Sequence, residues 1–186
     1  MPSDDILLEC EEKMEKAVEF FQRELRGIRT GRASAGLVEH IRVDYYGSPT
    51  ELRQLASIAV PEPDMILIKP FDPASVKDIE RAILASDLGI TPNTDGRIIR
   101  LPVPALSGER RKQLAAQLKK MAEQARVAIR NIRRDANRTV DKEKKEGIMT
   151  EDDALRCKED IQELTDDYGK RIDELLEQKT AEVMET

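Results

Sequence analysis

Aromatic residues are scarce in this chain of 186 residues, which has no tryptophan, three phenylalanines and three tyrosines. β-Sandwiches and barrels normally use more aromatic side chains in their strands. No apolar run approaches the roughly 18 to 20 residues that a helix needs to cross a bilayer. The acidic N-terminus also lacks the basic and apolar regions of a signal peptide. The composition therefore argues against an all-β, membrane-spanning or secreted protein, and we expect a cytoplasmic one.

Charge, by contrast, is abundant, since charged residues make up 37% of the chain against a usual quarter. The net charge of −6 on its own argues against a nucleic-acid partner. However, residues 110–145 contain 13 basic and 4 acidic residues, whereas residues 146–186 contain 5 basic and 14 acidic ones. A basic surface can therefore face a partner locally while the whole chain stays acidic.

Three segments, residues 4–29, 108–146 and 150–183, have the apolar spacing of long helices that pack side by side. The first repeats apolar residues every seven positions from Leu7 onward, and the second has no proline or glycine in its interior. The third begins with a capping-box signal at Thr150. These segments predict an antiparallel three-helix bundle.

The segment between the first two helices has a different texture. Short apolar runs alternate with turn signals, and an Asp-Pro pair at 72–73 opens a short helix, so we predict a compact α/β unit. We assign residues 1–30 and 106–186 to the bundle and residues 31–105 to this inserted domain. The predicted fold class is therefore α+β, a long three-helix bundle with an inserted small domain of β-α-β sandwich-like architecture.

Two short stretches connect the insertion to the bundle, and their small residues and proline favour a hinge. The candidate hinge residues are Arg29, Thr30, Gly31, Ala33, Ser34, Val103, Pro104, Ala105 and Ser107. At 1.5 Å per helical residue, Cys10 lies about 28 Å from this hinge and Cys157 about 45 Å or more. We therefore expect the two cysteines to lie far apart.

A basic stripe on the second helix is the sharpest functional signal. Its members stand seven apart or extend the same face: Lys112, Lys119, Arg126, Arg133, Arg130 and Asn137. On a helical wheel they point away from the apolar seam, so we expect them to be exposed. The alternative is a solvated face balanced by acids of the first and third helices. In that case acids are also expected four residues from members of the stripe, and only Glu123 meets that expectation.

The composition of the stripe favours RNA or another polyanion over a merely solvated face. Residues 126–138 contain five arginines and no lysine, and arginine suits bidentate contact with phosphate. No aromatic residues interleave with the stripe, so phosphates and shape, rather than stacked bases, are the features we expect it to read. We expect the acidic residues of 146–186, among them Asp166, Asp167 and Asp173, to lie on other faces.

Catalytic chemistry has little support. The only histidine, His40, is expected as an exposed residue on a strand, with no cysteine or serine in a nucleophile motif beside it. No glycine-rich phosphate loop is present, and the stretch 91–96 is expected as a simple loop. We therefore expect no catalytic residue, no metal and no cofactor.

Several long motifs match a known family. They are IRTGRAS at 28–34, YYGSPT at 45–50, LRQLAS at 52–57, ASDLG at 85–89, PN at 92–93, ERRK at 109–112 and the arginine-rich run 122–137. In order and over nearly all of its length, the chain resembles the ribosome recycling factor family. The resemblance implies the same bundle with an inserted domain, L-shaped and like tRNA in outline.

The resemblance also implies a function. A family member binds the large ribosomal subunit after termination and, with elongation factor G and GTP hydrolysis, splits the ribosome into subunits. It implies that Arg111, Arg130 and Arg133 contact rRNA, with Arg29, Arg32 and Arg126 as helpers. The partners would be large-subunit rRNA and elongation factor G, with no membrane and a monomeric chain. The pair Ser107-Gly108 departs from the family, which often has Thr-Glu there, and the glycine weakens that helix start.

Two other function classes stay open on the residues alone. A coiled-coil adaptor that binds protein partners is the main alternative, because long amphipathic helices also serve that role. Salt dependence distinguishes an RNA-binding factor from a coiled-coil adaptor. RNA binding weakens steeply with added salt, whereas apolar contact between proteins holds or strengthens. An enzyme in the α/β unit is the weakest class, because a nucleophile–base set is missing.

Overall fold

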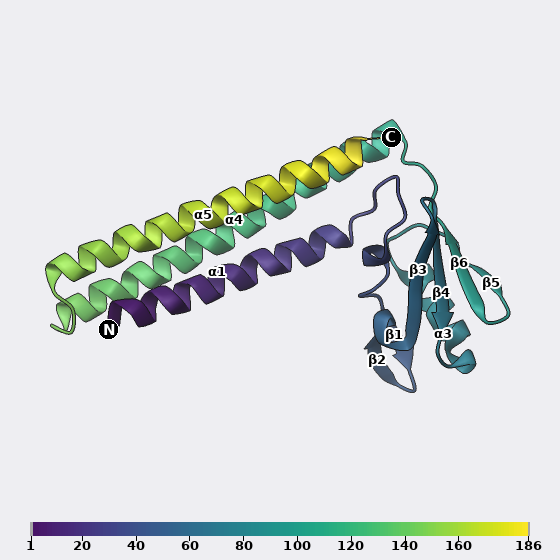
Figure 1. The fold of residues 1–186 in the computed structure, drawn as a ribbon, viewed down its shortest axis with the longest axis horizontal. Helices are drawn as coiled ribbons and strands as arrows, with labels where there is room; N and C mark the ends of the chain where they lie inside the picture. The colour runs from purple at the N-terminus through teal and green to yellow at the C-terminus, as the bar shows by residue number, and fades with distance from the viewer. Residues whose placement is uncertain (1, 186) are drawn as a thin grey trace. The chain divides into compact units, whose positions relative to one another are not determined.

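Three long helices dominate the structure, a computed structural model that describes residues 2–185 (Figure 1). They are α1 (Pro2–Arg26), α4 (Gly108–Lys145) and α5 (Glu151–Met184). The chain divides into two compact units, one made of the residues up to Leu25 and Ala115–Ala181, the other of Arg26–Leu114 and the residues from Glu182 onward. The predicted helices and the bundle that they form in the first unit are confirmed.

The bundle is held by apolar side chains that recur at helical spacing on all three helices. Among the most deeply buried are Met14, Val18, Phe21, Leu118, Ala122, Val140, Ile161 and Ile172. At the start of α1, Ile6 is buried and Leu7 is only half-buried, because the stripe steps back by fours from Met14 through Cys10. The heptad reading was therefore off by one residue in this first turn.

Side-chain caps and a glycine set the helix ends, and the cap at Thr150 was predicted from the sequence. Ser107 precedes α4, and its hydroxyl accepts a hydrogen bond from the Arg110 amide at 3.2 Å. Thr150 caps α5, since its hydroxyl accepts from the Asp153 amide at 3.1 Å and donates to that carboxylate at 2.6 Å. Gly147 ends the tight turn after α4 with a φ of 74°, a left-handed conformation that glycine adopts without strain.

The second unit is a small mixed domain. Its elements are η1 (Ala35–Leu37), β1 (Arg42–Tyr45), β2 (Ser48–Glu51), α2 (Leu52–Leu55), β3 (Ala56–Glu62), β4 (Met65–Pro70), η2 (Pro73–Ser75), α3 (Val76–Ala85), β5 (Asn93–Asp95) and β6 (Ile98–Pro102). The strands form a hairpin, β1–β2, and an antiparallel sheet in the order β3–β4–β6–β5. The Asp72 carboxylate caps η2 by accepting from the Ala74 amide at 3.0 Å, as the Asp-Pro pair predicts.

The core of this unit is aliphatic, which explains how it forms with few aromatic residues. Fully buried side chains come from the hairpin, α2, the four-stranded sheet and α3: Val43, Leu52, Ile66, Ile68, Ile79, Ile99 and Leu101. On β4, Ile66 and Ile68 alternate with the less buried Leu67, which is the period of a strand with one face on a core.

Four short elements were missed by the sequence reasoning. The stretch 91–96 contains β5 and is not a simple loop, and η1, β2 and α2 were not predicted at all. His40 lies in a turn before β1 and is half-buried, with Nδ1 3.5 Å from the Glu51 carboxylate, so its placement on an exposed strand face was wrong. These elements have three or four residues each, too few for periodicity to register.

The prediction that the cysteines lie far apart was also wrong. The Cys157 thiol lies 4.0 Å from the Ser3 carbonyl oxygen, and burial followed by nearby acids and the Cys10 thiol raises the pKa of Cys157. The prediction measured both helices from a common hinge level. In the bundle, Phe21 instead lies beside Met121, well inside α4, so α1 reaches to the level of the turn before α5.

Both connecting stretches are tied to the second unit. The Ala33 amide donates to the Pro63 carbonyl and the Val103 amide to the Asp64 carbonyl, each at 2.7 Å. Both acceptors belong to the turn between β3 and β4. Residues 33 and 103 are therefore fixed to the sheet.

Among residues 2–185, no helix combines the length and apolar character needed to span a membrane.

Candidate nucleic-acid interface

The basic stripe lies on α4, but its members differ in exposure. Lys112, Lys119 and Arg130 are exposed. The other stripe residues and the neighbouring Arg111 are only half-exposed: Arg111, Arg126, Arg133 and Asn137. The prediction that the whole stripe is exposed is therefore wrong for its half-exposed members, and for Arg126 and Arg133 the cause is α5, which approaches them.

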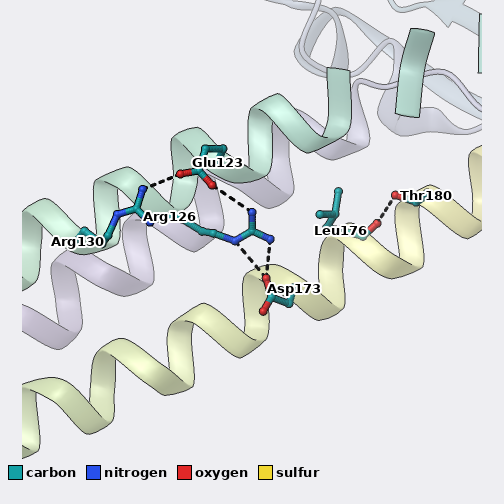
Figure 2. Close-up of polar contacts among 6 residues, drawn as sticks. All are labelled: Glu123, Arg126, Arg130, Asp173, Leu176 and Thr180. Atoms are coloured by element: carbon teal, nitrogen blue, oxygen red, sulfur yellow. Dashed lines mark hydrogen bonds and ion pairs between the residues drawn. The ribbon is translucent and has the colours of Figure 1, made fainter. Parts of the chain in front are cut away.

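Arg126 is held by an acid of α5. Its Nη2 and Nε donate to Asp173 Oδ1 at 2.6 and 3.2 Å, as Figure 2 shows. This hydrogen-bonded ion pair raises the pKa of Arg126, although burial opposes the shift. We expected Asp173 to lie on another face, and that placement was wrong, because the register of two packed helices is set by their apolar seams and cannot be read from charge counts.

Glu123 bridges two arginines of the stripe. Its Oε1 accepts from Arg130 Nη2 at 2.7 Å, and its Oε2 accepts from Arg126 Nη1 at 3.4 Å (Figure 2). The hydrogen bond from Arg130, and then that from Arg126, lowers the pKa of this carboxyl. Together Glu123, Arg126, Arg130 and Asp173 carry no net charge, so the middle of the stripe is locally neutral.

Arg133 meets a neutral partner. Its Nη1 donates to Gln162 Oε1 at 3.2 Å, and the Gln162 amide donates in turn to Asp166 Oδ1 at 2.9 Å. The charge of Arg133 is therefore not paired directly, and its guanidinium keeps further donors available. Nearby, the amide oxygen of Asn137 is shielded from solvent and has no hydrogen-bond partner among residues 2–185.

A second group of arginines lies in the other unit. Arg29 Nη2 donates to the Pro104 carbonyl at 2.6 Å, which joins the two connecting stretches. Burial, and then the positive charge of Arg110, lowers the pKa of Arg29. In the part of the chain that the structure describes, Arg29, Arg32, Arg110 and Arg111 form no ion pair, and Nε of Arg29 and of Arg111 is buried without an acceptor.

These observations define what each group can do. Unpaired guanidiniums that repel one another are suited to an anion, and arginine can offer a phosphate two parallel donors. The paired arginines of α4 are solvent-accessible, and exposed ion pairs contribute at most about 1 kcal/mol, so a phosphate can compete with the carboxylates. The arrangement supports binding of a polyanion along α4 and beside the connectors.

Sequence reasoning found the arginines and missed their partners. Asp173, Gln162 and Asp166 stand on another helix, and no spacing signal within α4 points to them. Glu123 was noted only as an exception in the stripe. Arg110 carried a signal, since it stands inside the ERRK motif, but it was not chosen as a candidate RNA-binding residue.

Across residues 2–185, no group of three or more histidine, cysteine, aspartate or glutamate side chains is arranged to hold a metal ion.

The fold and this surface define a class, a long three-helix bundle interrupted by a small sheet domain and bearing an arginine-rich face. Comparison with known proteins specifies the family. Residues 21–184 match the family model described as ribosome recycling factor. The chain is 52% identical to the ribosome-recycling factor of Geobacillus kaustophilus over 97% of both chains, and 49% identical to that of Bacillus subtilis over 98% of this chain and 99% of that one.

Solved structures agree. A solution structure of the ribosome recycling factor shares 43% identity and a TM-score of 0.78, covering 99% of this chain and 98% of that one. The T. thermophilus ribosome recycling factor, described with the E. coli elongation factor G bound to the E. coli post-termination complex, shares 37% identity and a TM-score of 0.68 over both full chains. This chain belongs to the ribosome recycling factor family, whose members are translation factors.

Proposed function

We propose that this protein binds the post-termination ribosome and, with elongation factor G and GTP, splits it into subunits. The observation that carries the proposal is the full-length match to the family, including the relative described with elongation factor G and the post-termination complex. The protein itself catalyses no reaction in this scheme. It acts as a monomer in the cytoplasm, and GTP hydrolysis by the elongation factor supplies the energy.

In this proposal, large-subunit rRNA docks on a surface formed by α4 and the first connector. Arg130 and Arg133 contact phosphates directly, because each retains donors that its observed partners leave unused. Arg111 contacts phosphate through its terminal nitrogens, since its Nε is buried. The remaining contacts come from Arg29, Arg32, Lys112, Lys119, Arg126 and Asn137. Asn137 contributes only through its amide nitrogen, since its oxygen is shielded.

The bundle and the inserted domain divide the work. Residues 1–30 and 106–186 form the rRNA-binding part, and residues 31–105 receive the push from elongation factor G. The hinge comprises the connectors on either side, from Arg29 to Ser34 and from Val103 to Ser107. Because Ala33 and Val103 are hydrogen-bonded to the β3–β4 turn, the bending in this scheme concentrates at residues 29–32 and 104–107.

Light scattering tests the proposal. Post-termination ribosomes are mixed with this protein, elongation factor G and GTP, and scattering falls as subunits separate. Omitting any one component should abolish the fall. Large-subunit binding, followed by pelleting, should weaken steeply with salt, because each neutralised RNA phosphate contributes roughly 0.7 to 0.9 to the logarithmic salt slope. Binding that holds or strengthens with salt, without splitting, would instead support the coiled-coil adaptor.

A further inference from the structure

Glu123 occupies an unusual position in the sequence and in the bundle. It is the sole acidic residue between Arg110 and Arg134. Its two oxygens accept from different arginines, Arg130 at 2.7 Å and Arg126 at 3.4 Å. Arg126 is also held from α5 by Asp173, so one connected chain of carboxylate and guanidinium groups runs across the face of α4 (Figure 2).

This network of linked carboxylate and guanidinium groups constrains the side chains of Arg126 and Arg130, which would otherwise move freely. A long arginine side chain has many rotamers, and ordering it on binding costs affinity. The bridge through one carboxylate fixes the separation of the two guanidiniums, and Asp173 fixes the direction of Arg126. Arg126 is 31% exposed and Arg130 is 49% exposed, so both remain accessible to a ligand while they are held.

The same carboxylates also remove charge. A stripe without Glu123 and Asp173 would attract any polyanion, whereas the neutral cluster attracts bulk RNA weakly. Selectivity for one RNA then depends on whether its phosphates lie where the two fixed guanidiniums can donate hydrogen bonds to them. Repelling wrong partners and ordering donors for the right one are both routes to specificity.

We propose that Glu123, assisted by Asp173, is the residue that positions Arg126 and Arg130 and makes this face selective for a matching RNA surface over bulk RNA. The proposal rests on the proposed function, since it assumes that the matching surface is on the large subunit. A purely structural role predicts something different, namely a change in bundle stability with no change in the ratio of the two affinities.

The first test compares Glu123→Gln with the control Asp135→Asn. Asp135 is on the same helix, loses the same charge when substituted and lies 3.8 Å from Arg138, a longer contact than that between Glu123 and Arg130. Affinity is measured for purified large subunits and for an unrelated RNA duplex at two salt concentrations. We expect Glu123→Gln to raise duplex affinity about two- to fivefold without raising large-subunit affinity, whereas Asp135→Asn shifts both equally.

The second test measures the mobility of the two arginine side chains directly. Nitrogen-15 NMR of the guanidinium groups measures how fast each one rotates. Glu123→Gln should speed rotation at Arg130 and, to a smaller degree, at Arg126, and Asp173→Asn should speed it at Arg126. Unchanged rotation, or a Glu123→Gln variant whose two RNA affinities move together, would overturn the proposal.

The two proposals fail differently. If the unsubstituted protein binds large subunits no better than it binds the duplex, the proposed function is wrong. The duplex and NMR measurements still decide whether Glu123 orders the arginines and limits binding to bulk RNA, because neither uses the ribosome.

Discussion

Arg133 is a half-exposed arginine of α4, and its guanidinium donates to neutral Gln162 instead of a carboxylate. Replacing it with alanine removes the guanidinium and keeps a good helix former, so the bundle should stay folded. A charge-assisted hydrogen bond to phosphate contributes about 1.5 to 3 kcal/mol, so Arg133→Ala should weaken large-subunit binding roughly ten- to 150-fold. Pelleting over a salt series should also show a slope smaller by about 0.7 to 0.9.

Arg156→Ala is the matched control, because Arg156 is exposed on α5 and loses the same charge. It should alter binding and the salt slope little. Equal losses in the two variants would mean that Arg133 acts only through net charge, and loss of helicity in circular dichroism would assign it a structural role.

A cluster between α1 and α5 governs stability instead of binding. Arg171 donates to both oxygens of Glu15 at 2.6 and 3.1 Å, and the Tyr168 hydroxyl donates to the same carboxylate at 2.8 Å. The Arg171 guanidinium also lies 5.1 Å from the Tyr168 ring centre. Burial, and then this hydrogen bond, raises the pKa of Tyr168 to about 12, so its hydroxyl stays protonated at neutral pH.

The bond from Arg171, and then that from Tyr168, lowers the pKa of Glu15 from its ordinary value of 4.5. A carboxyl with a lowered folded-state pKa stabilises the fold fully above its unfolded value and loses that contribution as the pH falls through the folded value. Glu15→Gln should therefore reduce the free energy of unfolding by no more than about 1 kcal/mol at neutral pH, since the pair is partly exposed.

Urea unfolding checks this expectation at about pH 7 and about pH 3, with the exposed Glu177→Gln as the control. The deficit of Glu15→Gln should shrink toward zero at the lower pH, and the control should show little deficit at either. A deficit that is as large in acid as at neutral pH would mean that packing, and not charge, is what Glu15 supplies.

At the scale of elements, Arg29 joins two segments that are 75 residues apart through its bond to the Pro104 carbonyl. Arg29→Ala removes this bond, which contributes about 1.5 to 3 kcal/mol because the donor is charged. Amide hydrogen exchange should become at least tenfold faster at Arg32, whose amide donates to the Thr30 hydroxyl in the first connector. The amides of Ala33 and Val103 should stay protected, because they donate to the β3–β4 turn.

Arg26→Ala provides the comparison, since Arg26 is exposed at the end of α1. Its exchange pattern in the connectors should match that of the unsubstituted protein. If Arg29→Ala leaves exchange at Arg32 unchanged, the first connector is held by other contacts.

How far the sequence predicts the structure also depends on the element. Long helices contain many repeats of the apolar spacing, so α1, α4 and α5 could be predicted from the residues alone. The cap at Thr150 could be predicted from its capping-box residues. Elements of three or four residues, such as β5 and α2, are too short for periodicity to register. β5 pairs with the neighbouring β6 across the turn at 96–97, so the Asp95-Gly96 pair was the local signal that could have predicted this hairpin. The stripe on α4 was predictable because its members share one helix.

The contacts between helices were not predictable in the same way. That Asp173 meets Arg126 depends on how far α5 slides along α4, and an offset of one turn would pair a different acid. The same offset, between α1 and α4, explains why the cysteines were misplaced. Charge composition could show that residues 146–186 are acidic, but it could not show that one of those acids neutralises the middle of the stripe.

At the scale of the whole molecule, the proposed hinge can be tested without altering any binding residue. Gly31 lies in the first connector and Gly108 at the start of α4, and a Cβ at either position would meet no atom within 4 Å. Neither has a positive φ, so alanine fits both backbones. The double variant Gly31→Ala with Gly108→Ala should stiffen the first connector and the start of α4, which adjoins the second connector, and raise stability by about 0.4 to 1 kcal/mol per site.

If splitting requires these connectors to bend while elongation factor G pushes, the stiffened protein should bind large subunits normally but split ribosomes several-fold more slowly. Gly169→Ala separates stiffness from stability, because Gly169 lies inside α5 with equally open space and alanine there gains about 1 kcal/mol of helix propensity. This control should be as stable as the double variant and split ribosomes at the normal rate in the light-scattering assay. Normal splitting by the double variant as well would reject bending at these glycines and favour a rigid body that transmits the push directly.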